Sequence, residues 1–294
     1  MTLVEKESGI FESFDKTPLY YEVRGQGEPL VLVNGLACPI NHWHFQTEHF
    51  AKSYKVITFD LRGHYKSQPL GNPKNLKVLD LARDLQGLLG HLNIAKAHFA
   101  GHSFGTPILL ELFRINPEIM ASMIFVNGFS RNPVKGMFGV DIIEPFFYFV
   151  KGQFEKYPDL STSLWRLAVD NPISMVLLGA AGGFNLKLTH FKDIEVYARG
   201  VARMDLQTFL VLLEEMMKFN GEGILPLIDI PTLIISGEND NVTPQSFQHD
   251  FSQKVNGSEF VLVPYGSHCT QLDFPDYVNV KIEEFLRKAS FTGK

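Results

Sequence analysis

Short apolar runs and longer segments with helical periodicity alternate along most of the chain. Six of the short runs are rich in Val, Ile and Phe and cover residues 29–35, 54–60, 95–101, 122–128, 231–237 and 258–266. Continuous apolar runs of this length are typical of strands that are buried on both faces of a sheet. Between residues 75 and 92, leucines recur at spacings of three and four, which predicts an amphipathic helix.

The beginning of the chain follows a different pattern. Residues 10–14 and 19–25 alternate apolar and polar positions and are separated by a polar turn sequence at 15–18, which predicts an antiparallel hairpin. Beyond it, the alternation of strands and helices predicts an α/β fold with a mainly parallel sheet flanked by helices. Ligands of such sheets bind outside the carboxyl ends of the strands, so residues just after each apolar run are the candidates for chemistry.

The alternation stops between residues 129 and 228, where helical and irregular patterns replace the apolar runs. We therefore predict a core made of residues 1–128 and 229–294, with an inserted helical cap at 129–228 that lies over the edge of the sheet. The aromatic-rich stretch at 145–157 fits either the packed side of a cap helix or the wall of a substrate channel, and the sequence does not decide between them.

Composition and charge exclude several classes of protein. The 294 residues are 45% hydrophobic and 20% charged, with a net charge of -5 and no cluster of Lys or Arg, so neither nucleic acid nor an anionic membrane surface is an expected partner. The apolar run at 173–184 is too short and too rich in glycine to cross a bilayer, and no integral membrane association is expected. Glu5, Lys6 and Glu7 interrupt any secretion signal, which indicates a cytoplasmic protein. The oligomeric state is left open.

Residues 101–105 read Gly-His-Ser-Phe-Gly, at the junction between a predicted strand and a segment with helical spacing. Ser103 could simply cap the helix through its side-chain oxygen. The same context is also that of a nucleophile elbow, in which small residues permit a sharp turn and the helix N-terminus directs N–H groups at a developing anion. A serine hydroxyl is a weak nucleophile, so the second interpretation requires a base and a group that orients the base.

Both partners are available after later strands. His268 follows the last apolar run and Asp240 follows the run at 231–237, so both are expected at the edge of the sheet where Ser103 lies. Serine, aspartate and histidine occur in the chain order of this architecture. Glu238 and Asp273 lie nearby in the sequence and remain competing candidates for the acid.

Five segments carry a resemblance to a known family. They are VLVNGLACPINHW, VITFDLRGHYKS, FAGHSFG, PTLIISGENDNVTP and GSHCTQLDFP. With these segments in this order, the sequence resembles the α/β-hydrolase superfamily, in its capped serine esterase and lipase-like branch. The resemblance implies that Ser103 is the nucleophile, His268 the general base and then acid, and Asp240 the residue that holds the imidazole tautomer. Some members place the acid after the strand that precedes the cap, but that position is Asn127 here and cannot be an anion.

The resemblance also implies an oxyanion hole formed by two backbone N–H groups, those of Leu36 and Phe104. This chain departs from the family pattern at two nearby positions. Asn34 precedes Gly35 where the family usually has His-Gly, and Tyr65 replaces a common glycine. Asn34 can still tie down its loop through the side-chain amide, whereas Tyr65 either narrows the site or changes only a turn.

The resemblance and the apolar, aromatic cap imply a serine hydrolase that cleaves a hydrophobic acyl or aryl ester through an acyl-enzyme. No cofactor and no metal are expected. The same residues would serve hydrolysis of an amide, thioester, lactone or carbon–carbon bond, because a fold does not determine the substrate. A small-molecule receptor with slow, incidental hydrolysis is a further alternative, and fast multiple turnover would distinguish an enzyme from it.

Several histidines receive simpler interpretations. His42, His44 and His49 precede or enter a predicted helix, where residues two apart do not share a face, so no metal site is expected there. His102 directly precedes Ser103 in the chain, and its side chain is expected to serve packing or the turn rather than catalysis.

The two cysteines, Cys38 and Cys269, are too few for a disulfide framework and are expected to be reduced. Cys38 lies two residues after Leu36, and Cys269 directly follows His268. The resemblance therefore places both on loops that border one pocket. Packed thiols without a chemical role are the simplest interpretation, although a bulky thiol reagent would block the pocket if either thiol were accessible.

Overall fold

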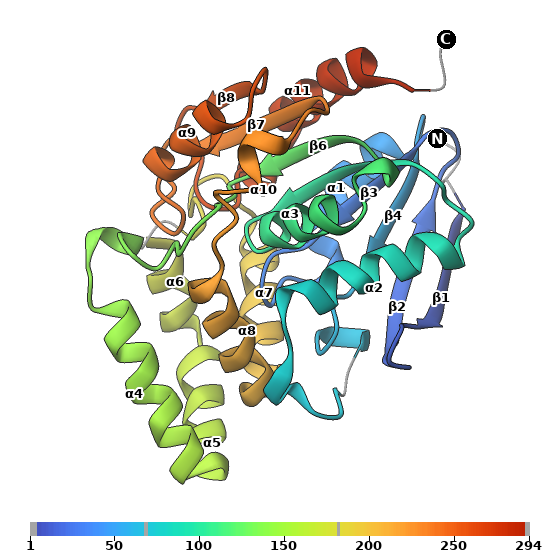
Figure 1. Cartoon of the computed structure of the whole chain (residues 1–294). Helices are drawn as coiled ribbons and strands as arrows, with labels where there is room; N and C mark the ends of the chain where they lie inside the picture. Colours follow the sequence, from blue (N-terminus) through green and yellow to red (C-terminus); the bar gives the residue numbers. More distant parts are fainter. Residues whose placement is uncertain (1–4, 68–69, 181–182, 292–294) are drawn as a thin grey trace.

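The computed structural model describes residues 5–67, 70–180 and 183–291, and it contains one sheet of eight strands (Figure 1). The strands are β1 (Lys6–Glu12), β2 (Pro18–Arg24), β3 (Pro29–Val33), β4 (Lys55–Phe59), β5 (Ala97–His102), β6 (Met120–Val126), β7 (Thr232–Gly237) and β8 (Glu259–Val263). Their order across the sheet is β1-β2-β4-β3-β5-β6-β7-β8. β1 and β2 form the expected antiparallel hairpin and β2 is antiparallel to β4, whereas the remaining neighbours are parallel. The mainly parallel α/β fold is confirmed.

Helices cover both faces of this sheet (Figure 1). They are α1 (His44–Phe50), α2 (Val78–His91), α3 (Gly105–Ile115), α4 (Ile143–Lys156), α5 (Pro158–Val169), α6 (Pro172–Ala180), α7 (Phe191–Arg203), α8 (Leu206–Lys218), α9 (Gln245–Lys254), α10 (Thr270–Asp273) and α11 (Pro275–Ala289). On one face, α2, α3 and α9 bury Leu85, Ile108 and Phe251 in a large apolar cluster. On the other face, α1 and α11 bury Phe50 and Ile282 in a second cluster. Burial on both sides explains why the central strands form continuous apolar runs in the sequence.

The helix expected at 75–92 is present as α2, but it begins three residues later and ends one residue earlier. Lys77 precedes it in an extended conformation, and its backbone N–H donates to the side chain of Asp80 (3.0 Å). This contact satisfies a backbone donor at the helix entrance and ends the extended segment there. Leu81 and Leu85 are fully buried, as the leucine spacing predicts.

The segment between β6 and β7 contains helices α4 to α8 and no strand among its described residues. In Figure 1, α4 and α5 project furthest from the sheet. The last helix of the segment, α8, returns to the sheet, because Leu210, Leu212 and Met216 belong to the large apolar cluster that also contains α2 and α3. The inserted segment therefore shares a hydrophobic core with the rest of the chain at α8. Its division from the core at residues 129 and 228 stays a prediction.

The aromatic-rich stretch at 145–157 forms most of α4. Phe147 is buried and Phe154 is partly buried against the large apolar cluster, whereas Phe146 and Phe149 are exposed. Packing thus explains one side of this helix, and its other side faces solvent.

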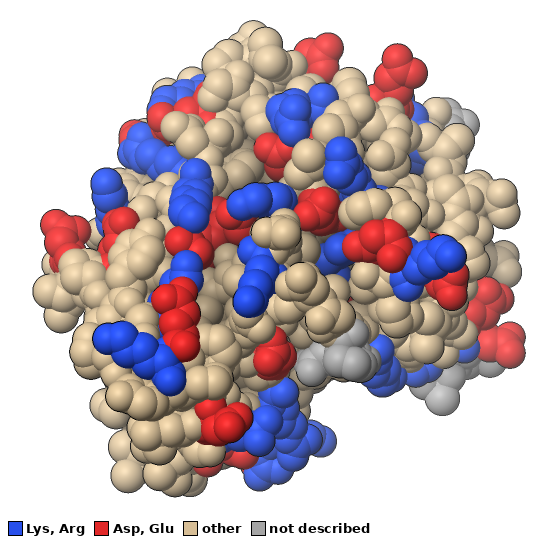
Figure 2. Space-filling view, turned by 60° about the horizontal axis from the view of Figure 1, so that its bottom comes forward, with Lys and Arg blue, Asp and Glu red and all other residues tan. Residues whose placement is uncertain are grey.

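On one face of the molecule, charges of both signs are mixed. Figure 2 shows Lys and Arg interspersed with Asp and Glu over the face that it displays. Among the described residues, no helix combines the length and the apolar character that crossing a membrane requires.

Candidate active site

Ser103 lies at the sharp turn between β5 and α3, in a left-handed backbone conformation with φ of 50°. Close packing requires the glycines on either side of it. A Cβ at residue 101 would lie 3.0 Å from the carbonyl carbon of Gly105, and a Cβ at residue 105 would lie 2.7 Å from the carbonyl oxygen of Val33. The strained turn between strand and helix places the serine at the carboxyl edge of the sheet.

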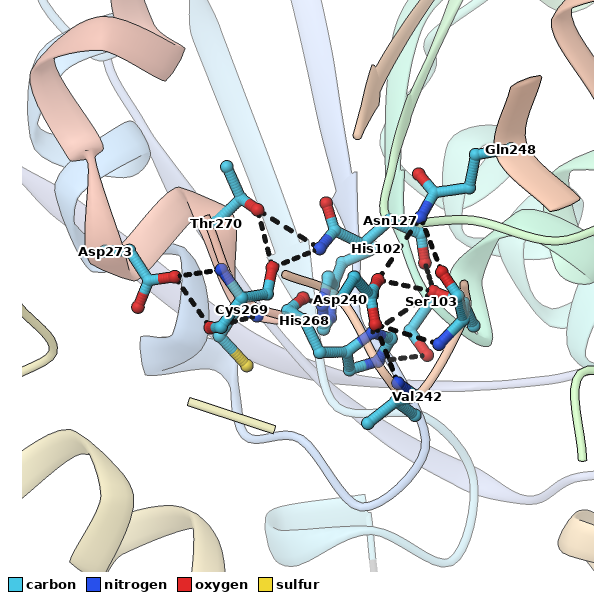
Figure 3. A network of polar contacts seen from close by, with 12 residues as sticks. His102, Ser103, Asn127, Asp240, Val242, Gln248, His268, Cys269, Thr270 and Asp273 are labelled. Carbon is cyan, nitrogen blue, oxygen red and sulfur yellow. Dashed lines mark hydrogen bonds and ion pairs between the residues drawn. The ribbon is translucent and has the colours of Figure 1, made fainter. Parts of the chain in front are cut away.

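Ser103, His268 and Asp240 form a continuous hydrogen-bonded chain (Figure 3). Nε2 of His268 is 2.9 Å from Ser103 Oγ, and Nδ1 is 3.0 Å from Asp240 Oδ2 and 3.1 Å from Oδ1. An ionised carboxylate only accepts hydrogen bonds, so Nδ1 carries the proton and Nε2 presents its lone pair to the serine hydroxyl. Exposed fractions are 8% for Ser103 and His268 and 3% for Asp240. The structure thus brings together the three residues that the sequence singled out.

Asp240 has further hydrogen-bond donors besides His268. The backbone N–H groups of Val242 and Thr243 donate to Oδ1 at 2.9 and 2.8 Å. The Thr243 hydroxyl and the Gln248 amide donate to Oδ2 at 2.6 and 3.2 Å (Figure 3). Sequence reasoning missed both side chains. The Asp-x-x-Thr spacing is a turn signal that could have indicated Thr243, but no local pattern marks Gln248, which reaches the site from α9.

The competing acids are held elsewhere. Glu238 is exposed and accepts a backbone N–H from the loop after β8 at 3.0 Å. Asp273 accepts from the backbone N–H and the hydroxyl of Ser267, both at 2.6 Å. Asn127 donates its side-chain amide to the carbonyl of Ser267 at 2.5 Å. Asp273 and Asn127 therefore hold the backbone that precedes His268.

His102 packs beside the same histidine. Its Nε2 lies 2.8 Å from the backbone carbonyl oxygen of His268, and the centroids of the two rings are 4.9 Å apart. The residue next to Ser103 in sequence thus holds the main chain of His268.

The loop after β3 approaches Ser103 closely. A Cβ at Gly35 would lie 3.2 Å from Ser103 Cβ, so a glycine permits the approach. The side-chain amide of Asn34 donates to a carbonyl at the end of β4 (3.1 Å) and ties the loop down. Leu36 follows in this loop, and Phe104 follows the serine at the start of α3. The two residues expected to donate to an oxyanion thus belong to the two segments that meet at Ser103.

Tyr65 holds the same loop from another side. Its hydroxyl donates to the carbonyl of Ala37 (2.9 Å), and the Ala37 N–H donates to Nε2 of His64 (2.9 Å). Burial lowers the pKa of His64 to about 4, which keeps its imidazole neutral and able to accept this bond. A Cβ at Gly200 on α7 would lie 1.7 Å from the Tyr65 hydroxyl oxygen. Tyr65 therefore connects the loop after β3 to the inserted segment.

The histidines at positions 42, 44 and 49 have separate surroundings. His44 Nδ1 lies 2.7 Å from a backbone carbonyl in its own turn, and His49 Nε2 lies 3.2 Å from a carboxylate oxygen of Glu283. His42 is buried and stacks on Tyr197, with 5.4 Å between the ring centroids.

Both cysteines are buried. Burial raises the pKa of the Cys38 and Cys269 thiols, which favours the protonated form. Cys269 packs with Met175 and Phe184 in a small apolar cluster. In this conformation, therefore, neither thiol is accessible to a bulky reagent.

Comparison with known proteins identifies the family of this chain. A family model described as "alpha/beta hydrolase fold" matches residues 28–158, and one described as "TAP-like protein" matches residues 219–293. The chain belongs to the α/β-hydrolase superfamily. Its class of activity is accordingly that of a hydrolase.

Several relatives and solved structures are similar over long stretches. The "Putative carbamate hydrolase RutD" of Azorhizobium caulinodans is 25% identical over 262 residues, which cover 89% of this chain and 92% of the relative. The "(E)-2-((N-methylformamido)methylene)succinate hydrolase" of Acinetobacter baylyi is 34% identical over 117 residues, which cover 40% of this chain and 43% of the relative. A thermophilic esterase from Thermogutta terrifontis superposes with a TM-score of 0.75 at 21% identity, covering 97% and 100% of the two chains. The enol-lactonase from Burkholderia xenovorans LB400 superposes with a TM-score of 0.73 at 20% identity, covering 95% and 100%.

Proposed function

We propose that this protein is a serine hydrolase that cleaves a hydrophobic carboxylic ester through an acyl-enzyme. The observation that carries the proposal is the hydrogen-bonded chain from Asp240 through His268 to Ser103, with 3.0 and 2.9 Å between the bonded atoms. These distances are within reach of direct proton transfer. The arrangement supplies both requirements of a serine nucleophile, a base in contact with it and an acid that orients the base.

In the first half-reaction, Ser103 Oγ attacks the ester carbonyl carbon while its proton passes to Nε2 of His268. The N–H groups of Leu36 and Phe104 stabilise the negative charge on the former carbonyl oxygen. The carbon–oxygen bond to the alcohol then breaks, and the imidazolium returns the proton to the leaving oxygen. In the second half-reaction, water gives a proton to Nε2 and attacks the acyl carbon, which releases the acid and regenerates Ser103.

Apolar side chains beside the catalytic residues support a hydrophobic substrate. Met175, Phe184 and Leu272 share one apolar cluster with Cys269, which directly follows His268. Four members of this cluster come from the inserted segment, namely Met175, Phe184, Ile194 and Ala198. An acyl or aryl group gains about 25 cal/mol for each Å² of apolar surface that it buries against such side chains.

A second candidate is hydrolysis of a carbon–nitrogen bond. The observation in its favour is the similarity to proteins described as putative carbamate hydrolases, which extends over 89% of this chain for the Azorhizobium relative. The same three residues would act, but the nitrogen must be protonated before it leaves. Proton transfer from His268 would then limit the rate more than in ester hydrolysis.

A matched set of substrates separates the candidates. It contains p-nitrophenyl esters of graded acyl length, a p-nitrophenyl carbamate and a p-nitroanilide. We expect multiple turnover of the esters, with kcat/KM rising with acyl length and exceeding that of the carbamate and the anilide. A higher kcat/KM for the carbamate or the anilide than for the esters would contradict ester hydrolysis and favour hydrolysis of a carbon–nitrogen bond. A single slow turnover with a large thermal shift would indicate a receptor.

Ser103→Ala tests the nucleophile, with Ser130→Ala as its matched control. Ser130 is also buried and follows β6 at the same edge of the sheet. We expect a fluorophosphonate probe to modify Ser103 in peptide mass spectrometry, and Ser103→Ala to lose labelling and turnover at an unchanged Tm. Ser130→Ala should keep both. Labelling of a different serine, or near-full activity in Ser103→Ala, would refute the assignment.

A further inference from the structure

A thiol and two imidazoles outside the catalytic triad converge behind it. Cys38, His42 and His102 each offer one ligand atom, and these atoms all lie within 4.8 Å of one another. All three residues are buried. They come from the loop after β3, the short 3₁₀-helix Ile40–Trp43 and the end of β5, so no local sequence pattern joins them.

The tautomer of His102 leaves a lone pair free for a ligand. Its Nε2 lies 2.8 Å from the backbone carbonyl oxygen of His268, and a carbonyl oxygen only accepts, so Nε2 carries the proton. Nδ1 therefore holds the lone pair. This nitrogen is buried and has no hydrogen-bond partner among the described residues. Histidines that bind metals commonly donate their other N–H to a carbonyl or carboxylate in this way.

His42 presents a second buried imidazole without partners. Only 2% of the residue is exposed, and neither ring nitrogen has a hydrogen-bond partner among the described residues. A neutral imidazole keeps one nitrogen lone pair that can bind a metal ion. Leaving a polar group buried and unpaired costs about 1–3 kcal/mol, so such groups call for an explanation. Tyr197 and Phe184 pack against this ring and fix its position.

We propose that Cys38, His42 and His102 form a binding site for one Zn²⁺ ion. One thiolate sulfur and two imidazole nitrogens are a donor set that zinc prefers and that Mg²⁺ or Ca²⁺ does not. With bonds of about 2.0–2.3 Å, tetrahedral zinc holds its ligand atoms about 3.3–3.8 Å apart. Side-chain movements of about 1 Å therefore close the site. On binding, the Cys38 thiol releases its proton to solvent as the sulfur–zinc bond forms, and the fourth position takes water.

Zinc at this site inhibits the enzyme, a consequence that rests on the proposed function. The Cys38 N–H donates to the carbonyl of Gly35 (3.2 Å), so Cys38 closes the turn that contains Leu36. Drawing the sulfur toward the two imidazoles shifts this turn and with it the Leu36 N–H. Loss of a single oxyanion donor lowers kcat by about 10²–10³ fold.

Zinc binding is measurable without any substrate. Metal-free protein is titrated with Zn²⁺ against a chromogenic chelator, and the bound metal is counted by elemental analysis. We expect one Zn²⁺ per chain, and affinity lower by at least about 100-fold in Cys38→Ser and in His42→Gln. Cys269→Ser and His44→Gln are the matched controls and should bind as the wild type does. Co²⁺ gives a second readout, a thiolate-to-cobalt charge-transfer band that Cys38→Ser lacks and Cys269→Ser retains.

The outcomes separate the site from its consequence. The proposed site would be overturned if the protein bound no stoichiometric zinc. It would also be overturned if zinc binding survived in Cys38→Ser and disappeared in His268→Ala. Inhibition is scored as the ratio of ester turnover with and without Zn²⁺, and we expect a low ratio for wild type and a ratio near one for Cys38→Ser. Zinc bound through the three residues with unchanged turnover would overturn the inhibitory role alone. Zinc bound in a protein without hydrolytic activity would contradict the proposed function and leave the site intact.

Discussion

Asp273 connects the loop that carries His268 to the inserted segment. The substitution Asp273→Asn should weaken this connection and leave the catalytic step nearly unchanged. Its Oδ2 accepts the N–H and hydroxyl of Ser267 at 2.6 Å each. Its Oδ1 accepts the N–H of Asn185 at 3.2 Å and the hydroxyl of Thr189. Asn185 and Thr189 lie between α6 and α7, so one buried carboxylate holds both segments.

The loss of stability in Asp273→Asn can be worked out from the hydrogen-bond donors that face the carboxylate. An asparagine has one acceptor oxygen. If this oxygen stays on the two donors of Ser267, the NH₂ group faces Asn185 and Thr189. The Thr189 hydroxyl can rotate to accept, but the Asn185 N–H cannot and loses its acceptor, which costs about 1–3 kcal/mol. Lost charge assistance in the remaining bonds adds roughly 1 kcal/mol. The total is about 2–4 kcal/mol.

Thermal unfolding and steady-state kinetics measure the effect. At about 2.1 cal/mol/K per residue, a chain of 294 residues has an unfolding entropy near 0.6 kcal/mol/K, so Tm should fall by about 3–6 °C. KM should rise because the segment that carries Asn185 loosens, whereas kcat should change by less than about tenfold because the contacts of His268 with Ser103 and Asp240 remain. Asp276→Asn, an exposed neighbour with the same change of charge, should leave Tm and KM unchanged.

Asp240→Asn provides the contrasting result. Its amide cannot favour the required histidine tautomer, so kcat should fall by about 10³–10⁴ fold. If Asp273→Asn lost this much activity while Asp240→Asn kept it, the acid would be wrongly assigned. An unchanged Tm in Asp273→Asn would refute the anchoring role.

Two further substitutions test buried groups around the loop after β3. Burial raises the pKa of Asp60 from 3.8 to about 6, so the folded state holds this proton more tightly than the unfolded chain does, and stability falls by about 2 kcal/mol as pH rises from 4 to 7. Asp60→Asn should remove this fall in urea unfolding at pH 4 and pH 7, and equal pH dependence in both proteins would contradict it. Gly200→Ala should lower Tm and kcat together, because the new Cβ displaces Tyr65 from Ala37 at a cost of about 1–3 kcal/mol. Gly200→Ala/Tyr65→Phe should recover part of the Tm, and no recovery would argue against this clash.

The sequence indicated those parts of the structure that leave a local signal. Buried parallel strands produce apolar runs, and the Ser103 turn requires small residues at fixed positions, so both are visible within a few residues. The sequence also indicated Asp240 and His268 as candidates, because each lies within three residues of the end of such a run. Chemistry excluded one alternative position for the acid of the triad, because the side-chain amide of Asn127 cannot be an anion.

Contacts between distant residues left no such signal. Gln248 reaches Asp240 from another helix, and Thr189 reaches Asp273 across 84 positions of the chain. In the sequence, a polar residue on the exposed side of a helix cannot be distinguished from one that joins a buried hydrogen-bond network. Only the three-dimensional fold separates the two cases. For the same reason, the pattern of α8 shows an amphipathic helix but not that it returns to the apolar cluster of the sheet.

The loop that carries His268 illustrates why such contacts matter. A loop lacks the repeating hydrogen bonds of a helix or strand, so other groups must fix its main chain. Asn127 binds the carbonyl of Ser267, Asp273 binds its N–H, and His102 binds the carbonyl of His268. Two of these anchors, Asn127 and His102, stand at the carboxyl ends of the central strands β6 and β5. The main chain that carries the imidazole is thereby attached to the buried central strands, so the position of His268 beside Ser103 exists before a substrate binds, and the reorganisation that proton transfer would otherwise require is small.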